Sequence, residues 1–362
     1  MASKAEIRAE AARLQALFEA AGAVAVDADI LQPASTLLDL YGEDIRARAF
    51  VTHDPLAGEQ MLRPDFTVPV VQMHMADGAE PARYTYSGEV FRRQEGASDR
   101  PSEYLQVGYE VFDRSDVARS DAEVFSVFHE TLAPLNLRAA TGDIGILIAA
   151  VQALSTSDRR KDALLRHLWR PGRFRALLER FGGMSPVPET RTRLLQNTDP
   201  LACASPLIGL RSIDDIAERI EALHADAKEP AIEAGQVALL EEILLLRADS
   251  PNALNTLENM TLRMPGLSSA VGRLSARLDA LGANGIDISK LPFEASYGRT
   301  SMEYYDGFVF GFYAGNRPDL PPVATGGRYD ALTKMLGQGR SIPAVGGVIR
   351  PGLVVRLAQV PQ

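Results

Sequence analysis

The stretch RYTYSGEVFRRQEGASDRPSEYLQVGYEVF, residues 83–112, constrains the fold more than any other part of the sequence. Two runs of alternating apolar and polar residues flank a loop rich in Gly, Ser, Asp and Pro, which is typical of a β-hairpin. Alternate residues of a strand share one face. If the two faces coincide, one side of the hairpin carries Tyr84, Tyr86, Gly88, Val90 and Arg92 beside Tyr104, Gln106, Gly108, Glu110 and Phe112. We therefore expect one Arg, one Gln and one Glu on a floor of aromatic and small residues.

These polar residues suit a zwitterionic amino acid as ligand. The guanidinium of Arg92 can bind a carboxylate or a phosphate through paired hydrogen bonds. The side-chain oxygens of Gln106 and Glu110 can accept from an ammonium or an imidazole, and Gly108 would let a ligand lie close to the backbone. A solvent-facing hairpin with ordinary surface charges would show the same alternation, so the pattern alone leaves both interpretations open.

The order of the other expected elements indicates an α+β fold. A helix is expected over residues 4–21, and a second helix, capped by Ser120, follows the hairpin. From about Asp158 to Leu281, Leu, Ala, Arg and Glu recur at helical spacing and strand-like runs largely vanish. Strand character returns in DGFVFGFYA, residues 306–314.

This order predicts an antiparallel sheet flanked by helices and interrupted by a helical module. We expect a first part of the core at residues 1–157, a helical insertion at 158–285 and a second part of the core at 286–362.

Composition restricts the class of protein. The hydrophobic fraction of 46% and the charged fraction of 23% are those of a soluble globular protein, and the net charge of −9 argues against one that mainly coats nucleic acid. The single cysteine, Cys203, allows no internal disulfide, and no His or Cys residues stand at metal-ligand spacing, so we expect neither a metal nor another cofactor. The N-terminus is charged and has no apolar core, so no signal peptide is expected. The longest apolar stretch, IGILIAAVQAL, is too short to span a membrane, and a cytoplasmic location is expected.

Five motifs, in order along the chain, resemble those of histidyl-tRNA synthetases, a family of class II aminoacyl-tRNA synthetases. YSGEVFRRQEG with EYLQVGYEVF resembles the second signature motif of that class, and MEYYDGFVF is similar to the family's histidine-recognition stretch. The other three motifs are MLRPDFTVP, GGRYDAL and PAVGG. The resemblance implies a six-to-seven-stranded antiparallel sheet, with a dimer formed around Ile30 to Tyr41. Carried over residue by residue, it implies a histidine pocket of Asp65, Thr67, Arg92, Gln106, Glu110, Tyr304, Tyr305 and Tyr329.

The positions that grip ATP in these synthetases differ here. Gln94 stands where the family has a Glu, and Thr300, relative to Glu303, stands where it has an Arg, with Arg299 one residue away. Leu353 replaces the Arg of the third motif beside Pro351, which we expect to break the helix, and neither Arg350 nor Arg356 is in register. Activation of an amino acid depends on stabilising phosphate charge, so we expect no catalytic residue in this chain.

The chain thus resembles a synthetase that has a histidine pocket, an altered ATP site and no segment similar to the anticodon-binding domain. In this combination it is similar to the regulatory subunits of ATP phosphoribosyltransferase. The resemblance implies a histidine-sensing homodimer that joins a short-form catalytic subunit in a hetero-oligomer, with tRNA not expected as a partner. Two alternatives stay open: a truncated synthetase-like ligase that activates an amino acid with ATP, and an interaction protein whose pocket is vestigial.

Three further motifs have structural interpretations. DRRKDALLRHLWRPGRFRALLERF, residues 158–181, is a candidate basic patch, but a solvated helical face with Trp169 and Phe174 turned inward is favoured. DAEV, residues 121–124, is expected to support the hairpin from the start of a helix. GGRYD alone indicates a glycine turn before a helix, with Arg328 a weaker ligand candidate than Tyr329.

Overall fold

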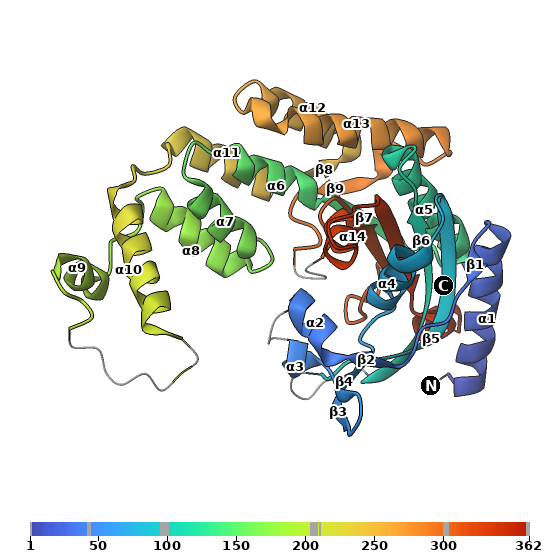
Figure 1. Ribbon diagram of the computed structural model, residues 1–362. Helices are drawn as coiled ribbons and strands as arrows, with labels where there is room; N and C mark the ends of the chain where they lie inside the picture. The colour runs from blue at the N-terminus through green and yellow to red at the C-terminus, as the bar shows by residue number, and fades with distance from the viewer. Residues whose placement is uncertain are drawn as a thin grey trace.

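The computed structural model describes residues 2–41, 45–94, 101–202, 209, 211–299 and 304–359. Most strands of these residues form one large sheet, which Figure 1 shows at the centre of the body. In spatial order its strands are β1 (Val24–Ala25), β5 (Ala82–Phe91), β6 (Glu103–Phe112), β12 (Ala344–Ile349), β11 (Ala324–Arg328), β10 (Phe308–Tyr313), β7 (Arg138–Asp143), β9 (Pro292–Glu294) and β8 (Arg247–Asp249).

The centre of this sheet is antiparallel, as the sequence predicts. Every pair of neighbouring strands from β5 to β7 in the spatial order is antiparallel. The short edge strands differ, because β1 runs parallel to β5 and β9 runs parallel to β7. These short strands extend the sheet beyond the six or seven strands that the resemblance implies.

Helices α1 (Lys4–Ala20), α5 (Val117–Leu132) and α15 (Pro351–Ala358) cover one face of the large sheet. Phe18 of α1 packs on Tyr109 of β6 and on Phe128 of α5, with ring centroids 5.4 Å apart in both pairs. Glu123 of α5 accepts hydrogen bonds from Arg83 at 2.6 Å and from the Tyr109 hydroxyl at 2.7 Å. Glu123 of DAEV thus supports the hairpin from α5, as predicted.

A smaller sheet and short helices flank the pocket side of the hairpin. The small sheet has the order β2 (Leu31–Pro33), β4 (Gly58–Leu62) and β3 (Val51–Asp54). Helices α2 (Ala34–Tyr41) and α3 (Ile45–Arg48) lie beside it, and α4 (Thr67–Asp77) leads from it towards β5. Helix α14 (Asp330–Leu336) packs on α4.

Helices dominate between β7 and β9. They are α6 (Ile144–Gln152), α7 (Asp158–Arg166), α8 (Pro171–Phe181), α9 (Glu189–Gln196), α10 (Ile213–Lys228), α11 (Ala234–Leu245), α12 (Ser250–Thr261) and α13 (Ser268–Ala283). The single turns η1 (Ala133–Leu135), η2 (Pro265–Leu267) and η3 (Ile288–Lys290) complete the helical elements of the described residues. Figure 1 shows α7 to α10 as a helical arm beside the body, while α13 packs on α5. Within this segment β8 returns to the edge of the large sheet.

Three local expectations are wrong. Asp116, not Ser120, caps α5, because its side chain accepts from the Arg119 N–H at 3.0 Å and starts the helix four residues earlier. Pro351 begins α15 instead of breaking it, since proline fits the first position of a helix. The glycines of GGRYD lie inside β11, and only Asp330 begins a helix.

In the described part of the chain, no helix is long and apolar enough to cross a membrane. The same residues contain no group of three His, Cys, Asp or Glu side chains that could hold a metal ion.

Candidate functional site

The register of the hairpin brings the two predicted faces together. Tyr84 on β5 lies opposite Glu110 on β6, and Gly88 lies opposite Gln106. Directly opposite residues of an antiparallel pair point to the same side of the sheet. Gln106 and Glu110 therefore share one face with the aromatic and small residues of β5, and the prediction is confirmed.

Glu110 is the centre of the site. Its side chain is completely buried. Oε1 accepts from the hydroxyls of Thr67 at 3.2 Å and Tyr86 at 2.7 Å, and Oε2 accepts from the hydroxyl of Tyr329 at 2.6 Å. Burial raises the pKa of Glu110 to about 7, although these hydroxyl donors oppose the rise. A carboxylate offers about four lone-pair sites, so one site is left for an N–H group of a ligand.

Two glycines make room for this arrangement. A Cβ atom at Gly346, which lies opposite Glu110 on β12, would overlap the carboxylate. A Cβ atom at Gly108 would overlap the ring of Tyr86. The space above Gly108 is therefore filled by Tyr86, and the expectation that a ligand lies there is wrong. Tyr86 and Gly346 are site residues that the sequence did not single out, although alternation had placed Tyr86 on this face.

Gln106 supplies an acceptor that lacks a donor. The side chain is 1% exposed, and its Oε1 atom has no hydrogen-bond partner among the described residues. A buried, unsatisfied polar group costs about 1–3 kcal/mol. A ligand that donates an N–H group to this atom would remove that cost, which makes Gln106 the strongest sign that the pocket is built for an occupant.

Arginines mark one end of the pocket. The side chain of Arg92 is oriented by the carbonyl of Pro64, which accepts from Nε at 2.7 Å. Arg350 donates to the carbonyl of Pro322, and its pKa is lowered by burial and by the nearby charge of Arg92. Counted along the sequence, Arg350 does not align with the arginine that binds phosphate in the family. In the folded chain, however, Arg350 lies beside Arg92 and Tyr104. Guanidinium groups placed together in this way attract a carboxylate or a phosphate.

Tyrosines lie in the same site as Glu110 and Arg92. The ring of Tyr304 lies 5.0 Å from that of Tyr305 and 6.1 Å from that of Tyr329, measured between centroids. Burial, together with the charges of Glu110 and Asp65, raises the pKa of Tyr305. Asp65 is itself buried and accepts from the Val68 N–H at 3.4 Å at the start of α4. The structure thus gathers the predicted pocket residues on one side of the sheet.

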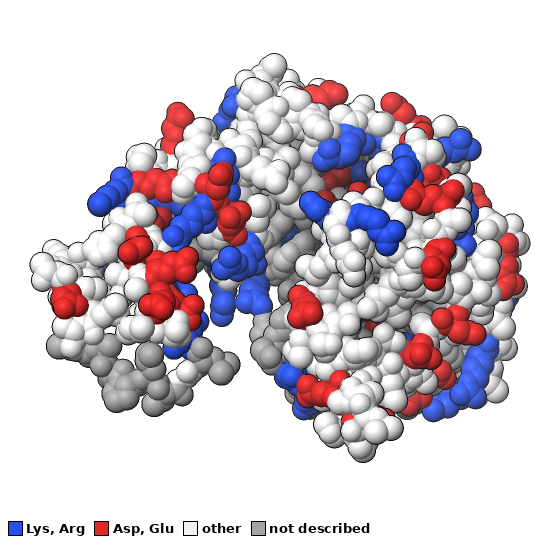
Figure 2. Space-filling model, in the orientation of Figure 1, with Lys and Arg blue, Asp and Glu red and all other residues white. Residues whose placement is uncertain are grey.

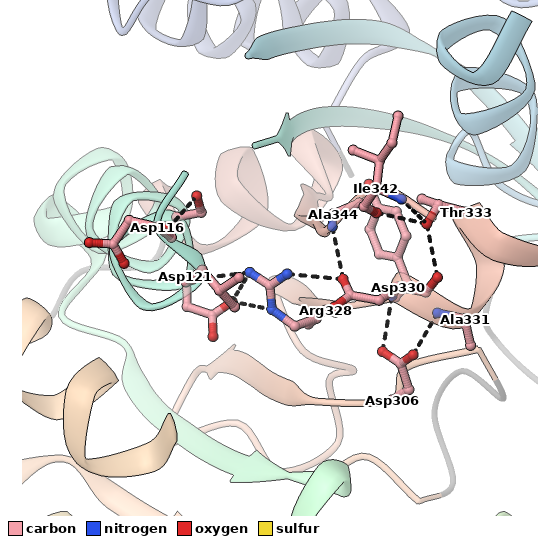
Figure 3. Close-up of polar contacts among 12 residues, drawn as sticks. Asp116, Asp121, Asp306, Arg328, Asp330, Ala331, Thr333, Ile342 and Ala344 are labelled. Carbon is pink, nitrogen blue, oxygen red and sulfur yellow. Dashed lines mark hydrogen bonds and ion pairs between the residues drawn. The ribbon is translucent and has the colours of Figure 1, made fainter. Parts of the chain in front are cut away.

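Arg328 belongs to a buried charge network (Figure 3). Its Nε donates to Asp121 at 2.9 Å and its Nη1 donates to Asp330 at 2.9 Å. Asp121 also pairs with Arg277 of α13 at 3.3 Å, although Asp121 was expected only as part of a helix start. These ion pairs give Arg328 a structural role, and the weaker ligand candidate of GGRYD is not part of the pocket.

Asp306 joins the network at the start of α14. Figure 3 shows its carboxylate at the first turn of α14, where it accepts from the N–H groups of Asp330 at 3.0 Å and Ala331 at 2.6 Å. Burial and the charge of Asp330 raise the pKa of Asp306 to about 7. Because Tyr329 immediately precedes α14, this network holds the donor that reaches Glu110.

Two of the positions expected to have lost their contact with ATP bind other parts of the chain. Gln94 donates to the carbonyls of Arg92 at 3.3 Å and Pro101 at 3.4 Å, so its side chain is bound to the hairpin itself. Leu353 packs against the hydrophobic core. Thr300 and Glu303 lie outside the described residues.

Comparisons with known proteins give the family. The profile of the family described as histidyl-tRNA synthetase matches residues 2–203 and 214–351. The ATP phosphoribosyltransferase regulatory subunit of Brucella anthropi is 31% identical over 354 residues, which cover 92% of this chain and 93% of that protein. The protein of the same name from Brucella canis is 32% identical over 344 residues, which cover 89% of each chain.

Solved structures show the same fold. The crystal structure of an ATP phosphoribosyltransferase regulatory subunit/histidyl-tRNA synthetase from Bacillus halodurans matches with a TM-score of 0.68 and 21% identity, over 98% of this chain and 79% of that one. A histidine–tRNA ligase subunit from Alicyclobacillus acidocaldarius matches with a TM-score of 0.61 and 23% identity, over 98% and 93% of the two chains. From its sequence relatives, the chain belongs to the family of ATP phosphoribosyltransferase regulatory subunits, built on the fold of histidyl-tRNA synthetases.

Proposed function

We propose that this chain binds free histidine in the Glu110 pocket and uses its occupancy to regulate a separate short-form ATP phosphoribosyltransferase catalytic subunit. Histidine bound in the pocket shifts the complex towards a less active state, while the chain without histidine activates its partner. The coupling is reciprocal, so substrates bound to the catalytic subunit change the affinity of the chain for histidine by the same factor.

The observation that carries this proposal is the unfilled hydrogen-bonding capacity between the buried oxygens of Gln106 and Glu110. Both atoms accept, and neither has a cationic partner among the described residues. An imidazole and an ammonium are both N–H donors, and the arginines at the end of the pocket suit the carboxylate of the same molecule. Histidine presents all three groups, and Tyr304 offers an aromatic wall for its ring.

We further propose that the chain performs no chemistry alone. Its relatives are called regulatory subunits, and Gln94 and Leu353 make contacts within the protein that do not serve a phosphate. The proposed working form is a homodimer inside a hetero-oligomer with the catalytic subunit, in the cytoplasm and without tRNA as a partner.

The test is a turnover assay of a short-form catalytic subunit from the same organism, with and without this chain, across a titration of histidine. The proposal expects activation by the chain and inhibition by histidine that requires the chain. Catalysis that is unaffected by the chain at every histidine concentration would overturn it.

One observation favours a second function, that of a ligase which activates an amino acid with ATP. Arg350 lies beside Arg92, at a place where a guanidinium could hold a phosphate of ATP. Histidine-dependent exchange of pyrophosphate into ATP by the chain alone would support this alternative. Loss of that exchange in an Arg350→Gln variant would assign the phosphate contact to Arg350.

A further inference from the structure

The turn between α7 and α8 concentrates positive charge in an acidic protein. Residues 158–175 contain seven Lys and Arg against two Asp, whereas the whole chain has a net charge of −9. Figure 2 shows Lys and Arg side chains gathered on the helical arm beside the hollow that separates the arm from the body. Arg166, Arg173 and Arg175 are exposed here and form no ion pair with any described residue.

A buried arginine from the body meets this turn. Arg299 is 7% exposed, and its Nε donates to the carbonyl of Leu168 at 2.8 Å. Its guanidinium lies over the ring of Phe174, with Cζ 4.9 Å from the centroid, and so reaches the first turn of α8. Its Nη2 atom is buried and has no hydrogen-bond partner among the described residues.

The charge of Arg299 has no counter-charge in the described part of the chain. Burial, together with the charge of Arg175, lowers the pKa of Arg299 to about 10, so the guanidinium stays charged at neutral pH. A buried charge without a partner is strongly unfavourable. An anion bound at Nη2 would remove this penalty.

The start of α8 offers further donors at the same place. No side chain caps α8, and space around Gly172 in its first turn is open. The N–H groups of a first helical turn point out of the helix, and the positive end of the helix dipole favours anions. His167, in the same turn between the helices, has a buried Nδ1 atom without a partner, and its pKa is lowered by burial and by Arg173, Arg170 and Arg166.

We infer that the α7–α8 turn and Arg299 form an anion site that binds the phosphate group of a small phosphorylated molecule. A phosphate bound at Nη2 of Arg299 can also accept from the first turn of α8 and from Arg173, because its tetrahedral oxygens can each meet a separate donor. The site lies where the arm meets the body, so its occupancy would fix the position of the arm.

The geometry favours a small molecule over a nucleic acid. The donors without a partner belong to one buried guanidinium and to the uncapped end of the helix that carries Phe174, which suits a single phosphate group. A nucleic-acid backbone needs a row of exposed cations, and the net charge of −9 repels a polyanion.

The test uses the only tryptophan of the chain, Trp169, which lies in the turn itself and is half-buried. Inorganic phosphate is exchanged for chloride at constant ionic strength while the fluorescence of Trp169 in the full chain is recorded. We expect a saturable change. In Arg299→Met, which keeps side-chain length but carries no charge, and in Arg173→Gln, the midpoint should shift by about tenfold or more, because each variant loses a charge-assisted hydrogen bond.

The matched control is Arg219→Gln, which removes one exposed positive charge from α10 of the same arm and should leave the midpoint unchanged. A parallel thermal-unfolding series guards against variants that fold poorly. Phosphate should raise the melting temperature of the unaltered chain and of Arg219→Gln, but not of Arg299→Met.

Three outcomes would overturn the inference: a response to phosphate no larger than that to chloride, equal midpoints in all variants, or binding of a short single-stranded oligonucleotide in place of phosphate. The result is separate from the proposed function, because the Arg173→Gln variant leaves the Glu110 pocket intact and should keep its inhibition by histidine.

Discussion

Glu110 has a buried carboxyl group whose hydrogen-bond donors are neutral hydroxyls, and this environment determines its pKa and its capacity to bind a ligand. Thr67, Tyr86 and Tyr329 hold its oxygens in place without supplying positive charge. The proton affinity of the group therefore stays high until a ligand contributes an N–H donor. Both predictions at this scale follow from that property.

The first prediction concerns Glu110→Gln. The amide keeps the shape of the side chain, and the surrounding hydroxyls can reorient to satisfy it, so the chain should fold. Histidine should bind about tenfold to a hundredfold more weakly, because a hydrogen bond to a charged group contributes about 1.5–3 kcal/mol. Calorimetric titration with histidine measures this change, together with the histidine dependence of turnover in the complex.

The control is Glu103→Gln, which makes the same substitution at an exposed position of the same strand. It should bind histidine as tightly as the unaltered chain. Equal affinities for all three proteins would remove Glu110 from the site.

The second prediction concerns pH. The pKa of Glu110 is raised in the folded state from 4.5 to about 7, so the folded state binds more protons than the unfolded state in that interval. Its contribution to stability is therefore fully present below pH 4.5 and is lost as the pH rises through 7. The free energy of unfolding of Glu110→Gln minus that of the unaltered chain should increase by about 3 kcal/mol between pH 4 and pH 8.

Urea unfolding at fixed protein concentration measures this difference. Asp306→Asn tests the other buried carboxyl group whose pKa is raised to about 7, and the two variants should each remove part of the same pH dependence. A difference between unaltered chain and Glu110→Gln that does not change with pH would show that Glu110 titrates normally.

At the scale of elements, the pocket depends on close contact between strands. Gly346 of β12 lies opposite Glu110 of β6, where only a hydrogen atom leaves room for the carboxylate. The site therefore depends on the missing side chain of Gly346 as much as on the carboxylate of Glu110.

The third prediction follows from this contact. Gly346→Ala should lower the free energy of unfolding by about 1–3 kcal/mol or more, because the added methyl group overlaps Glu110. Histidine binding should be lost with it. Gly272→Ala is the matched control, since its Cβ would meet open space on the exposed side of α13 and should stabilise the chain by about 0.5–1 kcal/mol. Equal stabilities of the two variants would mean that β12 can move away from Glu110.

Much of the hairpin could be predicted because alternation in a strand determines which residues share a face. Alternation does not reveal that a large side chain can extend over the neighbouring strand. We therefore predicted that a ligand lies over Gly108, whereas the ring of Tyr86 fills that space. The cap of α5 at Asp116 was missed because Ser120 also suits a cap, and the choice depends on where packing starts the helix. Arg350 was missed because motif register counts residues along the chain, whereas its guanidinium reaches Arg92 through space.

At the scale of the whole molecule, buried ion pairs join parts of the chain that are distant in sequence. Arg277 of α13 pairs with Asp121 of α5 at 3.3 Å and with Asp143 of β7 at 2.7 Å, and Asp121 pairs with Arg328 of β11. Removal of one partner from such a network leaves a buried charge unpaired. These ion pairs therefore fix α13 to the sheet that carries the pocket.

The fourth prediction concerns assembly. Large apolar side chains remain exposed on the small sheet, among them Leu31 at 47% and Val51 at 42%, and exposed apolar residues that gather in this way are typical of an interface. The proposed homodimer uses residues around Ile30 to Tyr41. Leu31→Asp should convert a dimer into a monomer at micromolar concentration, as measured by sedimentation velocity.

Leu262→Asp introduces the same charge at an 83% exposed position after α12 and should stay dimeric. A chain that sediments as a monomer before any substitution would contradict the dimer. Equal sedimentation of a dimer in all three proteins would place the interface elsewhere.

The position of β12 has a consequence for synthesis on the ribosome. A nascent chain appears N-terminus first, yet β12 inserts between β6 and β11 in the middle of the sheet. Until Ile349 has emerged, β6 presents an unpaired edge, and such edges recruit other chains into aggregates. The pocket also lacks Tyr329 and Gly346 for most of translation. Under the proposed function, a growing chain cannot bind histidine before β12 is in place. A product interrupted before β12 would therefore expose an unpaired strand edge to chaperones or proteases and could not act as a partial histidine sensor.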